Sequence, residues 1–241
     1  MNKLAVIAAA LSVVTATVAS AVVAPAAFAG PPQWTIQATT NPTASDGLQA
    51  VSCPSASACL AVGATGSNPT AAIAESWNGT SWTTTTPSPA PVKVASSSLQ
   101  AVSCTSATAC MAVGFWDDGS RAQHILAESW SGSSWSLQFP AASALATGMR
   151  LSAVSCPAVT ACMAVGIAHV PAISPGTWVT VAESWNGSTW TLDNTPNPLG
   201  AVMAGLGGVS CPAALVCAGV GAWTSVAAHR PPYATLAERY A

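Results

Sequence analysis

Apolar and small polar residues alternate along this chain in short runs, and the runs recur about every fifty residues. In residues 48–53 (LQAVSC) successive side chains alternate in size and polarity, which predicts a strand with one face on a core. A short loop at 54–58 leads to a second apolar run that starts at 59–63. Two β-rich runs, 71–77 and 80–86, complete the unit. Four antiparallel strands are therefore predicted in each unit.

The unit occurs four times. LQAVSC begins at Leu48 and returns at Leu99, and it becomes LSAVSC at Leu151 and LGGVSC at Leu206. Each copy continues through Cys-x-Ala-Val-Gly, with CAGVG in the last, and then reaches AESW, which becomes AERY in the last. A fixed period of this length is typical of a ring or a stack of identical units. The repeats are assigned to residues 48–98, 99–150, 151–205 and 206–241.

The third and fourth strands of each repeat form the clearest predicted hairpin. In the first three repeats they are joined by Asn78-Gly79, Ser131-Gly132 and Asn186-Gly187. Asn-Gly favours the positive φ angles of a type I′ turn. The same Asn positions match a glycosylation sequon, but the turn chemistry accounts for them. Tryptophans flank the turns and are expected to pack across each hairpin: Trp77 and Trp82, Trp130 and Trp135, Trp185 and Trp190.

Four antiparallel strands per repeat describe a β-propeller blade. We therefore expect an all-β fold, a β-propeller of four four-stranded blades. The fourth repeat shows only three strands, and the segment 31–40 carries Trp34, which lies 19 residues before Cys53. The corresponding tryptophans precede their cysteines by 22, 21 and 21 residues. The N-terminal segment is thus predicted to close the last blade and to cover its free edge. The alternatives are a fragment of a larger ring and an open solenoid, which would need polar caps that the sequence does not show.

The first 29 residues differ from the rest. A positive start is followed by an apolar run, residues 4–23, and by Ala27-Phe28-Ala29, which predicts a secretory signal peptide cleaved after Ala29. An uncleaved membrane anchor is the alternative, because a run of this length could span a bilayer. The signal predicts a secreted or cell-envelope protein that has no membrane segment after cleavage. Residues 30–241 form one predicted repeat domain.

Eight cysteines occur as four Cys-x5-Cys pairs, one in each repeat. In an exported protein this spacing favours four disulfides within the repeats over a zinc site, which would need Cys-x2-Cys or repeated histidines. No metal and no cofactor is predicted. The expected bridges are Cys53–Cys59, Cys104–Cys110, Cys156–Cys162 and Cys211–Cys217.

Composition limits the possible partners. Only 6% of the chain is charged, and without Lys3 five basic residues stand against eight acidic ones, a formal charge of −3. Nucleic-acid binding needs a basic surface, so it is excluded. Ten tryptophans and the regular valines argue for a packed core rather than disorder.

The unit Val-Ser-Cys-x5-Cys-x-Ala-Val-Gly…Ala-Glu-Ser-Trp-Asn-Gly-x-x-Trp resembles that of exported actinobacterial repeat proteins, over residues 34–241. Residues 76–82 (SWNGTSW) are also loosely similar to the Asp-box hairpin of sialidase- and sortilin-type propellers. They differ from that hairpin because Asn replaces Asp and one residue is missing before the Gly. The resemblance therefore implies a propeller-like blade and no activity.

One acid recurs in every repeat, in phase with packed residues. It is interpreted as a structural carboxylate that accepts backbone N–H groups from a neighbouring blade, and the alternative is a cation or polyol site around the ring axis. The four positions are Glu75, Glu128, Glu183 and Glu238.

The loops between the second and third strands differ in length, and unequal loops on a rigid scaffold often bind ligands. They span 64–70, 115–123, 167–180 and 222–235, and their candidate ligand-binding residues are Trp116, Asp117, Asp118, Trp178, Trp223 and Tyr233. The first hypothesis is an exported binding module for glycan, cell-envelope material or extracellular protein. The alternative is a polysaccharide hydrolase or lyase that uses loop acids or the repeated Glu. A purely structural envelope protein is a third interpretation. The sequence has no catalytic signature, and its three histidines occupy unrelated repeat positions.

Overall fold

The computed structural model describes residues 33–41, 43, 45–66, 70–88, 94–120, 122–141, 143, 145–171, 177–225 and 232–241. The predicted signal peptide at 1–29 lies outside these residues. The chain divides into two units, Met1–Ile36 and Gln37–Ala241, and every strand belongs to the second. Within the described ranges, no helix has the length and apolar character needed to cross a membrane.

The fold is all-β, as predicted, with fifteen strands and no helix among the residues described. The first repeat forms β1 (Gly47–Ser55), β2 (Ala58–Thr65), β3 (Ala71–Trp77) and β4 (Trp82–Thr85). The second forms β5 (Ser96–Ser106), β6 (Ala109–Asp117), β7 (Gln123–Trp130) and β8 (Trp135–Gln138). The third forms β9 (Gly148–Ala158), β10 (Ala161–His169), β11 (Trp178–Trp185) and β12 (Trp190–Asp193). The fourth has three strands, β13 (Met203–Ala213), β14 (Val216–Thr224) and β15 (Ala234–Tyr240).

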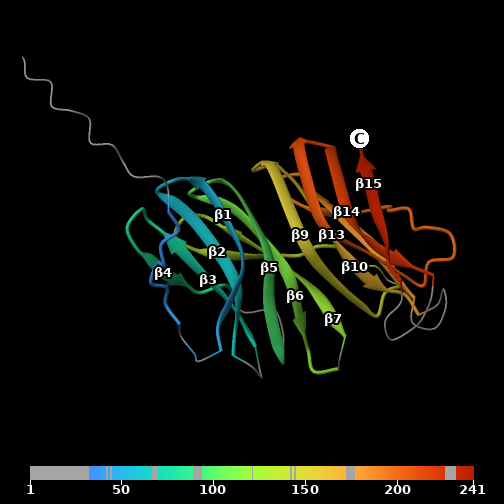
Figure 1. The fold of residues 1–241 in the computed structure, drawn as a ribbon, viewed down its shortest axis with the longest axis horizontal. Coiled ribbons are helices and arrows are strands. Elements are labelled where there is room, and N and C mark those ends of the chain that lie inside the picture. Colours follow the sequence, from blue (N-terminus) through green and yellow to red (C-terminus); the bar gives the residue numbers. More distant parts are fainter. Residues whose placement is uncertain are drawn as a thin grey trace, which may run out of the picture. The chain divides into compact units, whose positions relative to one another are not determined.

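Each repeat folds into one antiparallel sheet whose strands pair in sequence order. The third and fourth sheets join at a single parallel pair, Trp178 with Met203, and so count as one sheet of seven strands. The first strands of the repeats lie side by side in the order β1, β5, β9, β13 (Figure 1). The four repeats therefore follow one another as an array.

Among the residues that the structure describes, no closed sheet is found, so the predicted ring stays a prediction. In the described part of the chain β15 pairs with β14 only, whereas β3, β7 and β11 each pair with a fourth strand. Residues 33–40 form no strand, and Trp34 is fully exposed. The described residues thus form four-stranded units in three repeats and a three-stranded unit in the fourth.

One hydrogen bond recurs at every junction between repeats. The backbone N–H of a first-strand cysteine donates to the serine hydroxyl of the preceding first strand, at 3.0 Å in each case. The three bonds join Cys104 to Ser52, Cys156 to Ser103, and Cys211 to Ser155. The junctions are therefore built alike, because the same residues recur at the same positions.

The four disulfides are confirmed, each within one repeat and with Cα atoms 4.0–4.1 Å apart. They join the first and second strands close to the turn between them. The tryptophan pairs across the hairpins are confirmed as well, with ring centroids 5.3–5.6 Å apart. Together the bridges indicate an oxidising environment such as the cell exterior.

The hairpin turns differ from the prediction in type. Trp77 pairs directly with Trp82, so the loop has four residues rather than two. Gly79 has φ of 96°, but Asn78 does not have positive φ. The Asn78 carboxamide instead accepts the N–H groups of Thr80 and Ser81, both at 2.9 Å, so it organises the turn by its side chain. A type I′ turn was therefore the wrong expectation, although the hairpin lies where it was predicted.

The glycine of Cys-x-Ala-Val-Gly is required by a close backbone approach. At Gly166 the pairing of β9 with β10 shifts register, and the carbonyl of Arg150 lies where a side chain would begin. The same arrangement occurs in every repeat, with Gly63, Gly114 and Gly221 at the corresponding places. The first strand therefore bulges toward a position that only glycine can occupy.

Candidate functional site: paired pockets between repeats two and three

Two tryptophan–histidine pairs lie at the ends of the second and third strands in the middle of the array. In repeat two, Trp116 on β6 pairs with His124 on β7, and their rings stack with centroids 4.3 Å apart and planes 23° apart. In repeat three, His169 on β10 pairs with Trp178 on β11, with centroids 4.8 Å apart. Trp116, His169 and Trp178 were predicted in loops, but each belongs to a strand because the hairpins extend further than expected.

The two pairs lie on opposite faces of their sheets. Trp116 lies two residues after Gly114, whereas His169 lies three residues after Gly166. Because successive strand residues point to opposite faces, the pairs project from opposite faces of their sheets. Trp116 also packs against the buried cluster that joins repeats one and two. Each pair lies near a strand end and lines one of two adjoining pockets between repeats two and three.

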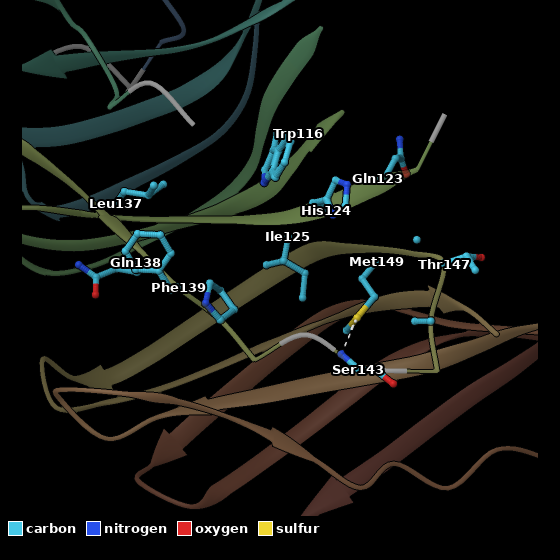
Figure 2. Close-up of a pocket in the computed structure, with 13 residues that line it drawn as sticks. Trp116, Gln123, His124, Ile125, Leu137, Gln138, Phe139, Ser143, Thr147 and Met149 are labelled. Atoms are coloured by element: carbon cyan, nitrogen blue, oxygen red, sulfur yellow. Dashed lines mark hydrogen bonds between the residues drawn. The ribbon is translucent and has the colours of Figure 1, made fainter. Parts of the chain in front are cut away.

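The first pocket has a volume of about 240 Å³ and is lined mainly by apolar side chains. Trp116 and His124 lie on one side, with Met149 and Ser143 on the other (Figure 2). The Ser143 N–H contacts the Met149 sulfur at 3.3 Å, which holds the segment before β9 over the pocket. The remaining lining comes from Gln123, Ile125, Leu137, Gln138, Phe139, Pro140, Ala146, Thr147 and Gly148.

The second pocket has a volume of about 470 Å³ and is more polar. It shares Gln123, Thr147 and Gly148 with the first, so the two adjoin. The Thr147 hydroxyl lies 2.8 Å from His169 Nδ1 and fixes the ring that packs on Trp178. Asp117, Ser120, Ala122, His169 and Trp178 complete the lining. We call the two together the paired pockets.

The two neighbouring acids hold the turn after β6. Asp117 accepts the N–H of Gly119, and Asp118 accepts the N–H of Ser120 at 2.8 Å. The Ser120 hydroxyl and N–H keep the pKa of Asp118 below its ordinary value, with a smaller effect from His124, whose Nε2 is 3.7 Å away. Of the two acids, Asp117 lines the second pocket. Both carboxylates are thus engaged in backbone capping.

The other predicted ligand-binding residues lie in repeat four. Trp223 occupies the repeat position of Trp116 but faces Ala234 across the hairpin, and it lines none of the pockets described. Tyr233 is exposed, and its hydroxyl contacts the sulfur of Met203 at 3.6 Å. The structure therefore brings Trp116, Asp117 and Trp178 together and leaves Trp223 apart.

The repeated glutamates lie away from the paired pockets. Glu75, Glu128 and Glu183 are almost fully buried, and Glu238 is half-buried. The N–H of Ser88 donates to Glu128 at 2.6 Å, and that of Ala141 donates to Glu183 at 2.9 Å. Both donors follow the fourth strand of the preceding repeat. The contacts are those that the structural interpretation requires, and they bind each sheet to the next.

Burial raises the pKa of all four glutamates. It raises the pKa of Glu128 to about 7 and that of Glu183 to about 8, although the N–H donors partly offset the effect. The pKa of Glu75 is raised in the same way, against a hydrogen bond from the backbone of Thr40. One oxygen of each carboxylate has no hydrogen-bond partner, which also favours the neutral form.

Several pocket residues carry no signal in the repeat. Phe139 and Met149 come from the connection between β8 and the start of β9, a stretch that differs in every repeat. The histidines were noted only for their unrelated repeat positions. Their signal was a nearby tryptophan, since Trp116 pairs with His124 and His169 pairs with Trp178 near the ends of corresponding hairpins.

Within the described ranges, no group of three or more His, Cys, Asp or Glu side chains could hold a metal ion. In comparisons with known proteins, no family model matches the chain. A search of curated proteins gives no significant match either.

Proposed function

We propose that the protein is an exported binding module that holds an uncharged glycan in the paired pockets. The observation that carries the proposal is the placement of Trp116 and Trp178, each packed on a histidine, in two adjoining pockets. Indole rings offer a flat apolar surface to the C–H faces of a sugar, while a few polar groups fix its hydroxyls. Gln123 and Thr147 supply such groups to both pockets, and Asp117 supplies one to the second.

The charge of the lining favours a neutral ligand over an acidic one. Among the residues that line the paired pockets there is one carboxylate and no lysine or arginine. An anionic sugar would be desolvated there without a cationic partner. The repeated glutamates do not reach these pockets, and Asp118 is engaged in its turn, so the pocket walls offer no pair of free carboxylates for hydrolysis.

The blades are part of the same proposal. We infer that the four repeats are propeller-type blades and that the segment around Trp34 is the fourth strand that the sheet of β13, β14 and β15 lacks. Support comes from the match of Trp34 to the first residue of β4, β8 and β12 and from the free edge of β15. Exposed edges of this kind are normally covered in native proteins.

Glycan binding is tested on the exported protein with a glycan array, followed by titration calorimetry on the strongest neutral hit. We expect Trp116→Ala and Trp178→Ala each to weaken binding at least tenfold, or about 1.4 kcal/mol, because each removes a stacking surface. Trp223→Ala is the matched control, since it occupies the repeat position of Trp116 outside the pockets, and it should bind as the wild type does. Thermal melts show that each variant is folded.

Two outcomes contradict the proposal. If no neutral glycan binds, or if the control loses as much affinity as the pocket variants, the paired pockets are not the glycan site.

A further inference from the structure

The contact between neighbouring repeats is the same at all three junctions. A valine of the second strand packs on a leucine and a valine of the next repeat's first strand. Val62 belongs to the same buried cluster as Leu99 and Val102, and the two further junctions repeat the set. They unite Val113 with Leu151 and Val154, and Val165 with Leu206 and Val209. The chain thus contains one interface three times over.

The two ends of the array expose the halves of a fourth such interface. At one end, Leu48 and Val51 of β1 are 42% and 58% exposed, whereas their counterparts Leu99 and Val102 are 0% and 8% exposed. At the other end, Val220 of β14 is 55% exposed, although its counterparts in the first three repeats are at most 2% exposed. Repeat arrays normally end in polar caps, so these apolar ends predict a partner.

The polar contacts of the junction are left open at the same two ends. The recurring bond needs a serine hydroxyl on the earlier repeat and a cysteine N–H on the later one. Ser210 is the serine of repeat four, and Cys53 carries the N–H of repeat one. Neither makes this bond within the part of the chain that the structure describes, so the two ends are complementary in polarity as well as in shape.

The connecting segments extend the pattern to the N-terminal side. Ser88 and Ala141, which donate to the next repeat's glutamate, each lie six residues after the tryptophan that begins the preceding fourth strand. Thr40, which donates to Glu75, lies six residues after Trp34. Residues 34–37 therefore correspond to the fourth strand of a sheet that would precede repeat one.

We propose that a second copy of this chain supplies that sheet. Its Val220 packs on Leu48 and Val51 of the first copy, its Ser210 hydroxyl accepts the Cys53 N–H, and the free edge of its β15 pairs with residues 34–37. A single arrangement satisfies all three features, because each repeats a contact already present at the internal junctions.

The same chain's own fourth repeat cannot take this place in the array as it stands. First strands contact one another in the order β1, β5, β9, β13, so β1 and β13 lie at opposite ends. The inference rests on the proposal that residues 34–37 are a fourth strand, and it adds which chain they join. The contact is heterologous, so it generates a closed ring or a filament according to the angle between copies.

The test measures self-association by sedimentation and light scattering over a range of concentrations. Val51→Asp and Val220→Asp each place a charge in one half of the interface, which should weaken association at least 100-fold because the charge would be buried without a partner. Val159→Asp is the control, since Val159 is 62% exposed at the turn between β9 and β10, away from both ends. It should associate as the wild type does.

Mixing the two end variants separates the second copy from closure within one chain. Each variant retains the half that the other lacks, so the mixture should form a one-to-one dimer although each alone is monomeric. A wild type that stays monomeric at all concentrations overturns the proposal. If Trp34 of this monomer is shielded from a fluorescence quencher, residues 34–37 are a fourth strand that closes within the same chain. If Trp34 is accessible to the quencher, the second-copy proposal and the fourth-strand proposal are both wrong.

Discussion

Gly166→Ala is expected to destabilise the protein by about 3 kcal/mol or to prevent its folding. The new Cβ would overlap the carbonyl oxygen of Arg150, and the clash involves backbone on both sides, so no side chain can move to relieve it. Urea unfolding followed by tryptophan fluorescence measures the loss. The effect should appear as a lower urea concentration at the unfolding midpoint, while the dependence of the free energy of unfolding on urea concentration stays unchanged.

Gly207→Ala provides the matched control for this substitution. Gly207 also lies in a strand, β13, but a Cβ there would meet nothing within 4 Å, and its φ is not positive. The control should change the free energy of unfolding by less than about 1 kcal/mol, with stabilisation possible through the unfolded chain. Equal effects of the two substitutions would show that the close approach of β9 to β10 is absent from the folded protein.

The free energy of unfolding is expected to fall as the pH rises from 5 to 9. Burial raises the pKa of Glu128 to about 7 and that of Glu183 to about 8, from an ordinary value of 4.5. The folded state therefore holds these protons more tightly than the unfolded state does. Their stabilisation is complete below pH 4.5 and is lost as the pH passes through the raised values. At about 1.4 kcal/mol for each pKa unit, the loss is on the order of 3 kcal/mol for Glu128 and 5 kcal/mol for Glu183.

Glu183→Gln identifies the source of this pH dependence. Glutamine keeps an oxygen to accept the Ala141 N–H but does not titrate. The free energy of unfolding of the variant should therefore depend much less on pH between pH 6 and 9. Glu238→Gln is the comparison, because Glu238 is half-buried and its removal should flatten the curve less. Denaturant titrations at pH 5, 7 and 9 suffice. Stability that rises with pH in the wild type would contradict the assignment.

The local structure of each repeat follows from the sequence alone. The alternation in residues 48–53, the Cys-x5-Cys spacing and the tryptophans around each hairpin fix strands, bridges and ring pairs, because all of these depend on residues close together in the chain. The turn type was missed because the Asn78 side chain, rather than its backbone, shapes the loop. Local chemistry is therefore predictable except where side chain and backbone compete for the same role.

The relation between repeats was harder to predict. Sequence equivalence assigns Trp34 to a fourth-strand position, but it does not say which chain carries the other three strands. The candidate site shows a similar limit. Trp116 and Trp178 were identified as candidates, yet their strand placement and their neighbours Phe139 and Met149 depend on how two sheets stack, and no periodic pattern encodes that.

Each disulfide joins two cysteines six positions apart, and none connects one repeat to another. Each bridge can consequently form within its own segment, without waiting for distant partners. Gene duplication or deletion of one repeat would leave every remaining cysteine with its disulfide partner. The disulfides thus place no restriction on how many repeats such a protein can carry, and its length is free to vary in evolution.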